Sequence, residues 1–127
     1  MEPWAAARAA ETANRDDHAR IAAEIASCPE PPPCYAYEAY RALAAHDHRF
    51  HALLAELAGN WQARVALDRT HCHLHIFRLY SAGGGMRTLA VHPRIAAAVT
   101  RSSASAAEQA MRDHLEQARD RLRAAFD

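Results

Sequence analysis

The chain of 127 residues contains no lysine, and its fifteen basic residues are all arginine. Fifteen acidic residues balance them, so the formal net charge is zero. A protein that neutralises several phosphates usually carries a basic excess on one face, so direct nucleic-acid binding by these residues is not expected. Aromatic residues are also few, at 7% of the chain. The chain is instead rich in Ala, Leu, Arg and Glu, and these residue types favour helix at nearly every position.

Long apolar runs are absent as well. No stretch reaches the roughly 20 apolar residues needed to span a bilayer, and no signal-like segment opens the chain. Cysteine is scarce, with three residues at Cys28, Cys34 and Cys72. Their number is odd, and they lack the spacing of a disulfide framework. This pattern predicts a cytoplasmic protein in a reducing compartment. A bridge between Cys28 and Cys34 is conceivable, but two free loop thiols are the favoured interpretation.

The length suits one domain over residues 1–127, and one proline-rich break, CPEPPPC at 28–34, interrupts an otherwise helical pattern. A first helix is expected at 2–12, and Asn14 is typical of the N-cap of a second. Further helices are expected at 37–58 (closed by Gly59), at 61–80, at 91–100, and from Ser103 or Ser105 to about 126. No segment has a strand pattern. The predicted fold class is all-α, an antiparallel bundle of about six helices.

The helix expected at 37–58 carries one ionised group within its apolar stripe. The core-facing positions of this helix are Tyr40, Leu43, Asp47, Phe50, Leu54 and Leu57. His51 follows Asp47 by one turn, so both side chains leave the same face with roughly 6 Å between their Cβ atoms. Burying an unpaired carboxylate costs several kcal/mol, so Asp47 should be paired with another group or bound to a cation.

Two later helices repeat this anomaly. His92 lies in the helix expected at 91–100, on a face shared with Ile95, Ala96 and Val99. His114 lies in the middle of a stripe formed by Ala107, Met111, Ala118, Leu122 and Ala125. Asp47, His51, His92 and His114 can therefore converge into a site of three nitrogens and one oxygen. Such a site suits zinc, with nickel or manganese as alternatives among the first-row divalent ions.

Each anomaly also has a purely structural explanation. A single histidine on an apolar face is more often a hydrogen-bonded core residue. Asp47 alone could pair with an arginine from a neighbouring helix. The metal site is favoured because the anomalies occur together, on stripes that should meet. His46 and His48 point away from Asp47 by helical geometry, so both are expected at the surface.

The segment THCHLH at 70–75 is rich in histidine but belongs to the helix expected at 61–80. The apolar line of that helix consists of Leu67, Leu74 and Phe77. His71 and Arg78 flank this line on one side. We interpret both as polar lining of a ligand cavity, with a solvated helix face as the alternative.

Two ordered groups of motifs resemble a known family. The first is Asp47-x-x-Phe50-His51-x-x-Leu54 followed by Ala58-Gly59-Asn60, and the second is His92-x-x-Ile95 followed by Ala110-Met111-x-x-His114-Leu115. Together they resemble the FCD domain, the C-terminal effector-binding half of GntR-type bacterial transcription regulators of the FadR branch. The resemblance covers essentially the whole chain, including Glu2-Pro3 and the alanines of the first helix.

The resemblance implies a bundle of six or seven helices. For the metal-containing members it implies one ion held by an Asp and three His, which correspond to Asp47, His51, His92 and His114. It also implies that open coordination positions bind a small carboxylate metabolite, that the protein is not an enzyme, and that it forms a homodimer.

The chain departs from the family pattern in three ways. It lacks the N-terminal winged helix-turn-helix, so contact with DNA is expected only through such a domain. Members often carry an arginine before the Leu-Glu of the first helix, where this chain has Met1-Glu2. Recognition of the carboxylate effector must then involve the metal, Arg78 or Asn60, or a group that the sequence does not identify. Pro93, directly after His92, also departs from the pattern and could displace that ligand.

Two rival functions remain open on the sequence. A metalloenzyme could use the open positions of a three-histidine, one-aspartate site to activate water. No further carboxylate or histidine is obviously placed as a general base, because Glu56 and Glu108 have surface positions. The second rival is a metal-free helical interaction module in which Asp47, His51, His92 and His114 form a buried hydrogen-bonded network. The leading hypothesis is the effector-sensing domain.

Overall fold

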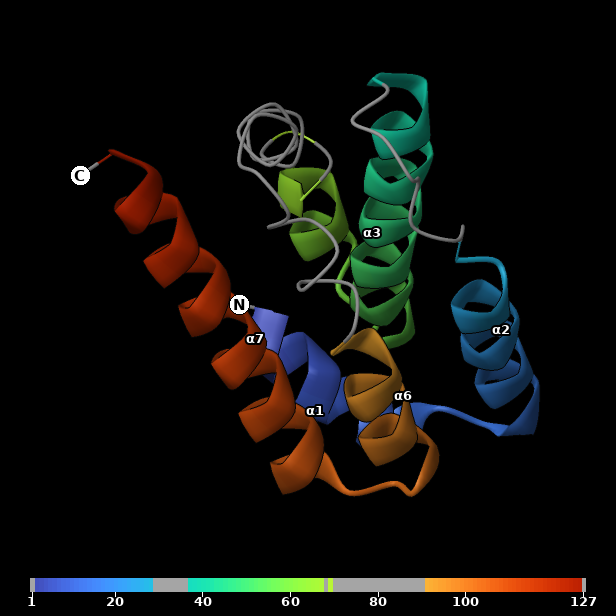
Figure 1. Ribbon diagram of the computed structural model, residues 1–127. Coiled ribbons are helices and arrows are strands. Elements are labelled where there is room, and N and C mark those ends of the chain that lie inside the picture. The colour runs from blue at the N-terminus through green and yellow to red at the C-terminus, as the bar shows by residue number, and fades with distance from the viewer. Residues whose placement is uncertain (1, 29–36, 68, 70–90, 127) are drawn as a thin grey trace.

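The computed structural model describes residues 2–28, 37–67, 69 and 91–126, and the regular structure in these ranges is α-helix (Figure 1). The helices with complete bounds are α1 Glu2–Thr12, α2 Arg15–Ala26, α3 Tyr37–Leu57, α6 His92–Thr100 and α7 Ala104–Phe126. Residues 61–67 are helical as well, so the helix expected at 61–80 is described at its start, and residues 70–80 lie outside the described ranges. The all-α class is confirmed.

The helix boundaries follow from local sequence. Asn14 caps α2 through a capping box in which its Oδ1 accepts the Asp17 N–H at 2.9 Å and the Asp17 carboxylate accepts the Asn14 N–H at 3.0 Å. Helix α3 ends at Leu57 and is followed by Gly59, whose φ of +77° lies in the left-handed region that glycine adopts without a Cβ penalty. Both signals were predicted from the sequence.

Helix α1 lies at the centre of the bundle and contacts α3, α6 and α7. Its buried face consists of Ala5, Ala6, Ala9 and Ala10, each at most 3% exposed. A methyl side chain lets neighbouring helix axes approach closely, because the distance between packed helices depends on the side chains at the contact. The alanines of α1 therefore allow three other helices to gather around it.

The core is formed by the predicted stripes of α3, α6 and α7. Phe50, Leu54, Ile95, Val99 and Met111 are each at most 1% exposed. In α2, Ile21 is buried, whereas Ala22 and Ala26 are exposed. Helix α2 packs mainly against α3 and α6. Among the described helices, none combines the length and hydropathy needed to cross a bilayer.

The connection between α6 and α7 sets the relative positions of these two helices. The Ser102 N–H donates to the Val99 carbonyl at 2.9 Å and the Ser103 N–H donates to the Ala98 carbonyl at 3.1 Å. This is a Schellman motif, with Ser102 at a φ of 58° where glycine is commonest. The turn folds α7 back onto α6, so that both helices can contribute to one interior site.

Candidate metal centre

Four buried polar side chains from three helices meet in the interior. Asp47 and His51 come from α3, His92 is the first residue of α6, and His114 lies in α7. Each is at most 2% exposed. One ligand-type atom from each residue can be chosen so that all four lie within 4.8 Å of one another. The structure thus brings together all four residues that the sequence selected as metal ligands.

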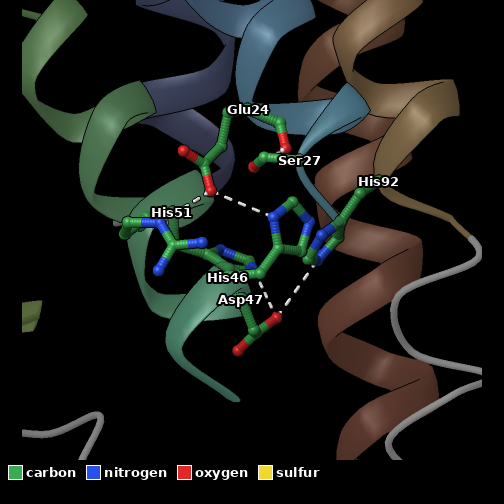
Figure 2. A network of polar contacts seen from close by, with 7 residues as sticks. Glu24, Ser27, His46, Asp47, His51 and His92 are labelled. Carbon is green, nitrogen blue, oxygen red and sulfur yellow. Dashed lines mark hydrogen bonds and ion pairs between the residues drawn. The ribbon is translucent and has the colours of Figure 1, made fainter. Parts of the chain in front are cut away.

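The four groups point their donor atoms toward a common region. Asp47 Oδ1 lies 3.1 Å from His92 Nε2 and 3.4 Å from His51 Nε2. His51 Nε2 lies in turn 3.3 Å from His114 Nε2. Figure 2 shows the contact between Asp47 and His92 at the lower end of the network. Three Nε2 atoms and one carboxylate oxygen therefore surround the same point.

His92 is held in place by packing. Its ring stacks on Phe50 with 4.3 Å between ring centroids and an angle of 22° between ring planes. Among the described residues, neither ring nitrogen has a hydrogen-bond partner, although Nε2 is close to Asp47 Oδ1. Burial lowers the pKa of His92 despite the opposing effect of Asp47. His92 is therefore neutral at pH 7, which is the form of imidazole that binds a metal. Pro93 lies in the first turn of α6 and leaves His92 beside Asp47.

His51 has the opposite electrostatic environment. Burial favours its neutral form, but Asp47 and Glu2 outweigh burial and raise the pKa of His51 to about 10. In the absence of a cation, His51 therefore supplies the positive charge that balances the buried Asp47 carboxylate. A divalent ion placed between the four groups would take over that role, and His51 would bind it after losing a proton.

Glu2 is a site residue that the sequence analysis did not select. Its Oε1 lies 2.7 Å from His51 Nδ1, on the ring nitrogen that does not approach Asp47. The Glu2 side chain is only 16% exposed. The helical pattern of α1 gave no signal for this contact, because the partner lies on a different helix.

His46 does not lie at the surface, and the prediction that it would was wrong. Its side chain is 1% exposed, and its Nδ1 lies 3.0 Å from Glu24 Oε1 (Figure 2). The reason is that α2 packs against this side of α3. Arg49 also donates to Glu24 Oε1, at 3.0 Å. His48, the other residue expected at the surface, is partly exposed.

The residues selected for effector binding are only partly described. Asn60 caps the helix at 61–67, since its Oδ1 accepts the Ala63 N–H at 2.9 Å. Its role in binding an effector stays a prediction. His71 and Arg78 lie outside the described residues.

A family comparison identifies the kind of domain. The model of the FCD domain matches residues 1–117, so the chain belongs to the FCD family of effector-binding domains. Comparison with curated proteins and with solved structures found no match.

The donor set fits a borderline divalent ion. Zinc prefers imidazole nitrogen and carboxylate oxygen at four-coordinate or somewhat larger sites, and nickel and manganese also accept these ligands. The neutral, buried His92 without a hydrogen-bond partner in the described residues is consistent with such an ion, because a buried polar group normally has a partner. The cluster is therefore compatible with metal binding.

Proposed function

We propose that this chain is an effector-sensing domain that holds one divalent ion through Asp47, His51, His92 and His114. Zinc is the first candidate, with nickel or manganese as alternatives. The observation that carries the proposal is the convergence of these four side chains, all buried, with ligand-type atoms within 4.8 Å of one another. Membership of the FCD family supports a regulatory role.

The ion would supply open coordination positions to a small carboxylate metabolite. The residues of this chain hold the ion from three helices, so a ligand that completes the coordination sphere favours the arrangement in which α3, α6 and α7 are drawn together. Such differential binding shifts the population between arrangements of the bundle. Asn60, His71 and Arg78 remain the candidates for contacts to the metabolite.

We infer a regulatory output rather than catalysis. In a regulator of this family the effector domain would pair with a second copy and control how winged-helix domains are held on DNA. Besides Asp47, Glu2 is a carboxylate that contacts the cluster within the described part of the chain. It approaches His51 at Nδ1, on the opposite side of the ring from Nε2 and Asp47. Glu2 is thus not directed at a water on the ion, as a general base would be.

Calorimetric titration with citrate and other small carboxylates tests this function. We expect binding to zinc-loaded protein and at least a tenfold loss after treatment with a chelator, restored when zinc is added back. Elemental analysis of the protein purified without added metal should give one ion for each chain. Asp47→Ala should remove both the ion and carboxylate binding.

His48→Ala is the matched control, because His48 lies one residue from Asp47 and is partly exposed. It should bind metal and carboxylate as the wild type does. Carboxylate binding that is the same with and without metal would contradict the proposed function. Turnover of a substrate by the metal-loaded protein would instead favour a metalloenzyme.

A further inference from the structure

We propose that Glu2 is a positioning residue for the metal centre: its carboxylate fixes the tautomer of His51 and presents the Nε2 lone pair to the ion. This inference rests on the proposed metal site and adds a fifth residue, from a fourth helix, to the four ligands. Glu2 would not touch the ion itself. It would act through the imidazole between them.

The two carboxylates beside His51 differ in distance. Glu2 Oε1 lies 2.7 Å from Nδ1, whereas Asp47 Oδ1 lies 3.4 Å from Nε2. When the ring carries one proton, the negative charge of Glu2, which lies closer to the ring than Asp47 does, favours that proton on Nδ1. Nε2 is then left with its lone pair directed toward Asp47 and toward His114, whose Nε2 is 3.3 Å away. A carboxylate in this position also increases the basicity of the coordinating nitrogen.

Glu2 is held firmly enough to play this part. It is the first residue of α1, where the helix dipole favours a negative charge. Four buried alanines fix α1 within the bundle. At the other end of α1, the Thr12 hydroxyl donates to the Leu57 carbonyl of α3 at 2.9 Å. Both ends of α1 therefore contact α3, Thr12 at Leu57 and Glu2 at His51.

His92 shows what His51 would be without this carboxylate. Among the described residues, no carboxylate contact to its Nδ1 corresponds to that of Glu2 with His51, and its ring stacks on Phe50. For His51 the contact with Phe50 is edge-on, with 5.7 Å between centroids and an angle of 81°. His51 also stacks on His114, with 5.3 Å between ring centroids and an angle of 19° between ring planes. Stacking therefore helps to orient both rings, and the Glu2 carboxylate beside Nδ1 bears on which nitrogen of His51 carries the proton.

The test compares Glu2→Ala and Glu2→Gln with the wild type in zinc affinity, measured by competition with a chromophoric chelator. Glu2→Ala should lose about 10-fold to 100-fold, the usual cost of removing an outer carboxylate partner. Glu2→Gln should lose less, because its amide oxygen still places a partial negative charge beside Nδ1–H. Glu11→Gln is the matched control on the same helix, since Glu11 is 53% exposed and pairs with Arg8. Its affinity should equal that of the wild type.

A second readout is independent of affinity. Nitrogen-15 NMR of the histidine rings in the zinc-loaded protein should show His51 protonated at Nδ1 and coordinated through Nε2. Circular dichroism should show that each variant is folded. If Glu2→Ala does not fold, the comparison of Glu2→Gln with the wild type provides the test.

The outcomes separate this inference from the function on which it rests. Zinc affinity in the folded Glu2 variants equal to that of the wild type, or coordination of His51 through Nδ1, would overturn the role of Glu2 and leave the metal site intact. A wild-type protein that binds no divalent ion would overturn both. Loss of affinity in Glu2→Ala with partial rescue in Glu2→Gln supports the inference.

Discussion

Helix α3 buries two histidines in different ways, one turn and a residue apart. His46 is 1% exposed and contacts one carboxylate, Glu24, which also accepts a bond from Arg49. His51 is equally buried but lies among Asp47, His92 and His114 as well as Glu2. In the first arrangement, the buried imidazole of His46 has a carboxylate partner in Glu24. The second places three imidazoles close to Asp47, with Glu2 on the far side of the His51 ring.

The comparison teaches that burial of a histidine does not by itself indicate a metal site. One buried imidazole can be satisfied by one carboxylate, as His46 is by Glu24. In the cluster, His51 and His92 both approach Asp47 Oδ1, and His114 Nε2 instead makes a hydrogen-bond contact of 3.3 Å with His51 Nε2. Convergence of several donors on one point is therefore the feature that distinguishes the candidate metal centre.

The largest effect should come from removing a ligand. His92→Ala should weaken zinc binding by at least about 100-fold, more than the loss of an outer-sphere partner. His46→Ala should leave the affinity within about threefold of the wild type, because its Nδ1 is engaged by Glu24 away from the ligand atoms. Competition titration with a chelator measures both. Equal losses in the two variants would show that the distinction between the two histidines is wrong.

Adding metal should stabilise the protein strongly. At a free zinc concentration one hundred times the dissociation constant, binding to the folded state alone contributes about 2.7 kcal/mol, which corresponds to a rise in Tm of roughly 10 °C. The increase should be present in His46→Ala and absent in Asp47→Ala. Differential scanning calorimetry with zinc and with chelator measures it. A zinc-dependent rise that persists in Asp47→Ala would place the ion elsewhere.

Removing Glu24 should affect stability and leave metal binding unchanged. Glu24→Ala leaves the buried His46 Nδ1 without the acceptor that it has in the wild type, at a cost of about 1–3 kcal/mol in the free energy of unfolding. Urea denaturation in the presence of chelator measures this loss. A change in zinc affinity that accompanies this loss would mean that the contact between His46 and Glu24 is coupled to the candidate metal centre.

The pH dependence of zinc binding should report the proton on His51. Its pKa of about 10 lies above the ordinary value of 6.5, so protonated His51 stabilises the metal-free fold below pH 6.5, and this contribution is lost as the pH rises through about 10. Zinc competes with that proton. The affinity should therefore increase by about tenfold for each pH unit in the neutral range, with release of about one proton.

Calorimetry in two buffers with different ionisation enthalpies counts the released protons. His46→Ala should give the same count as the wild type, because His46 is not among the four ligands. A count near zero at pH 7.5 would contradict the electrostatic description of His51.

The all-α class and the burial of Asp47, His51, His92 and His114 could be predicted because their signals are local. The spacing of Leu43, Phe50 and Leu54 defined the buried face of α3, and Asp47 was visible as a charged interruption of it. The capping box at Asn14 and the glycine at position 59 likewise depend on a few neighbouring residues. Periodicity is enough for such features, because it states which residues share one face of one helix.

The partners across helices could not be predicted in the same way. Periodicity placed His46 off the main stripe of α3, but it could not show that α2 would cover that side and bring Glu24 to it. Glu2 is a comparable case, since its contact with His51 depends on how α1 crosses α3. A single helical pattern contains no information about which helix packs on a secondary face.

X-ray absorption spectroscopy of the zinc-loaded protein tests the central claim most directly, since it reports the atoms bound to the ion. Three imidazole nitrogens and a carboxylate oxygen should appear at roughly 2.0–2.2 Å, with no sulfur neighbour and with further oxygen from solvent or an added carboxylate. His92→Ala and His114→Ala should each lose imidazole scattering. A first shell with sulfur, or with oxygen alone, would contradict a metal centre built from Asp47, His51, His92 and His114.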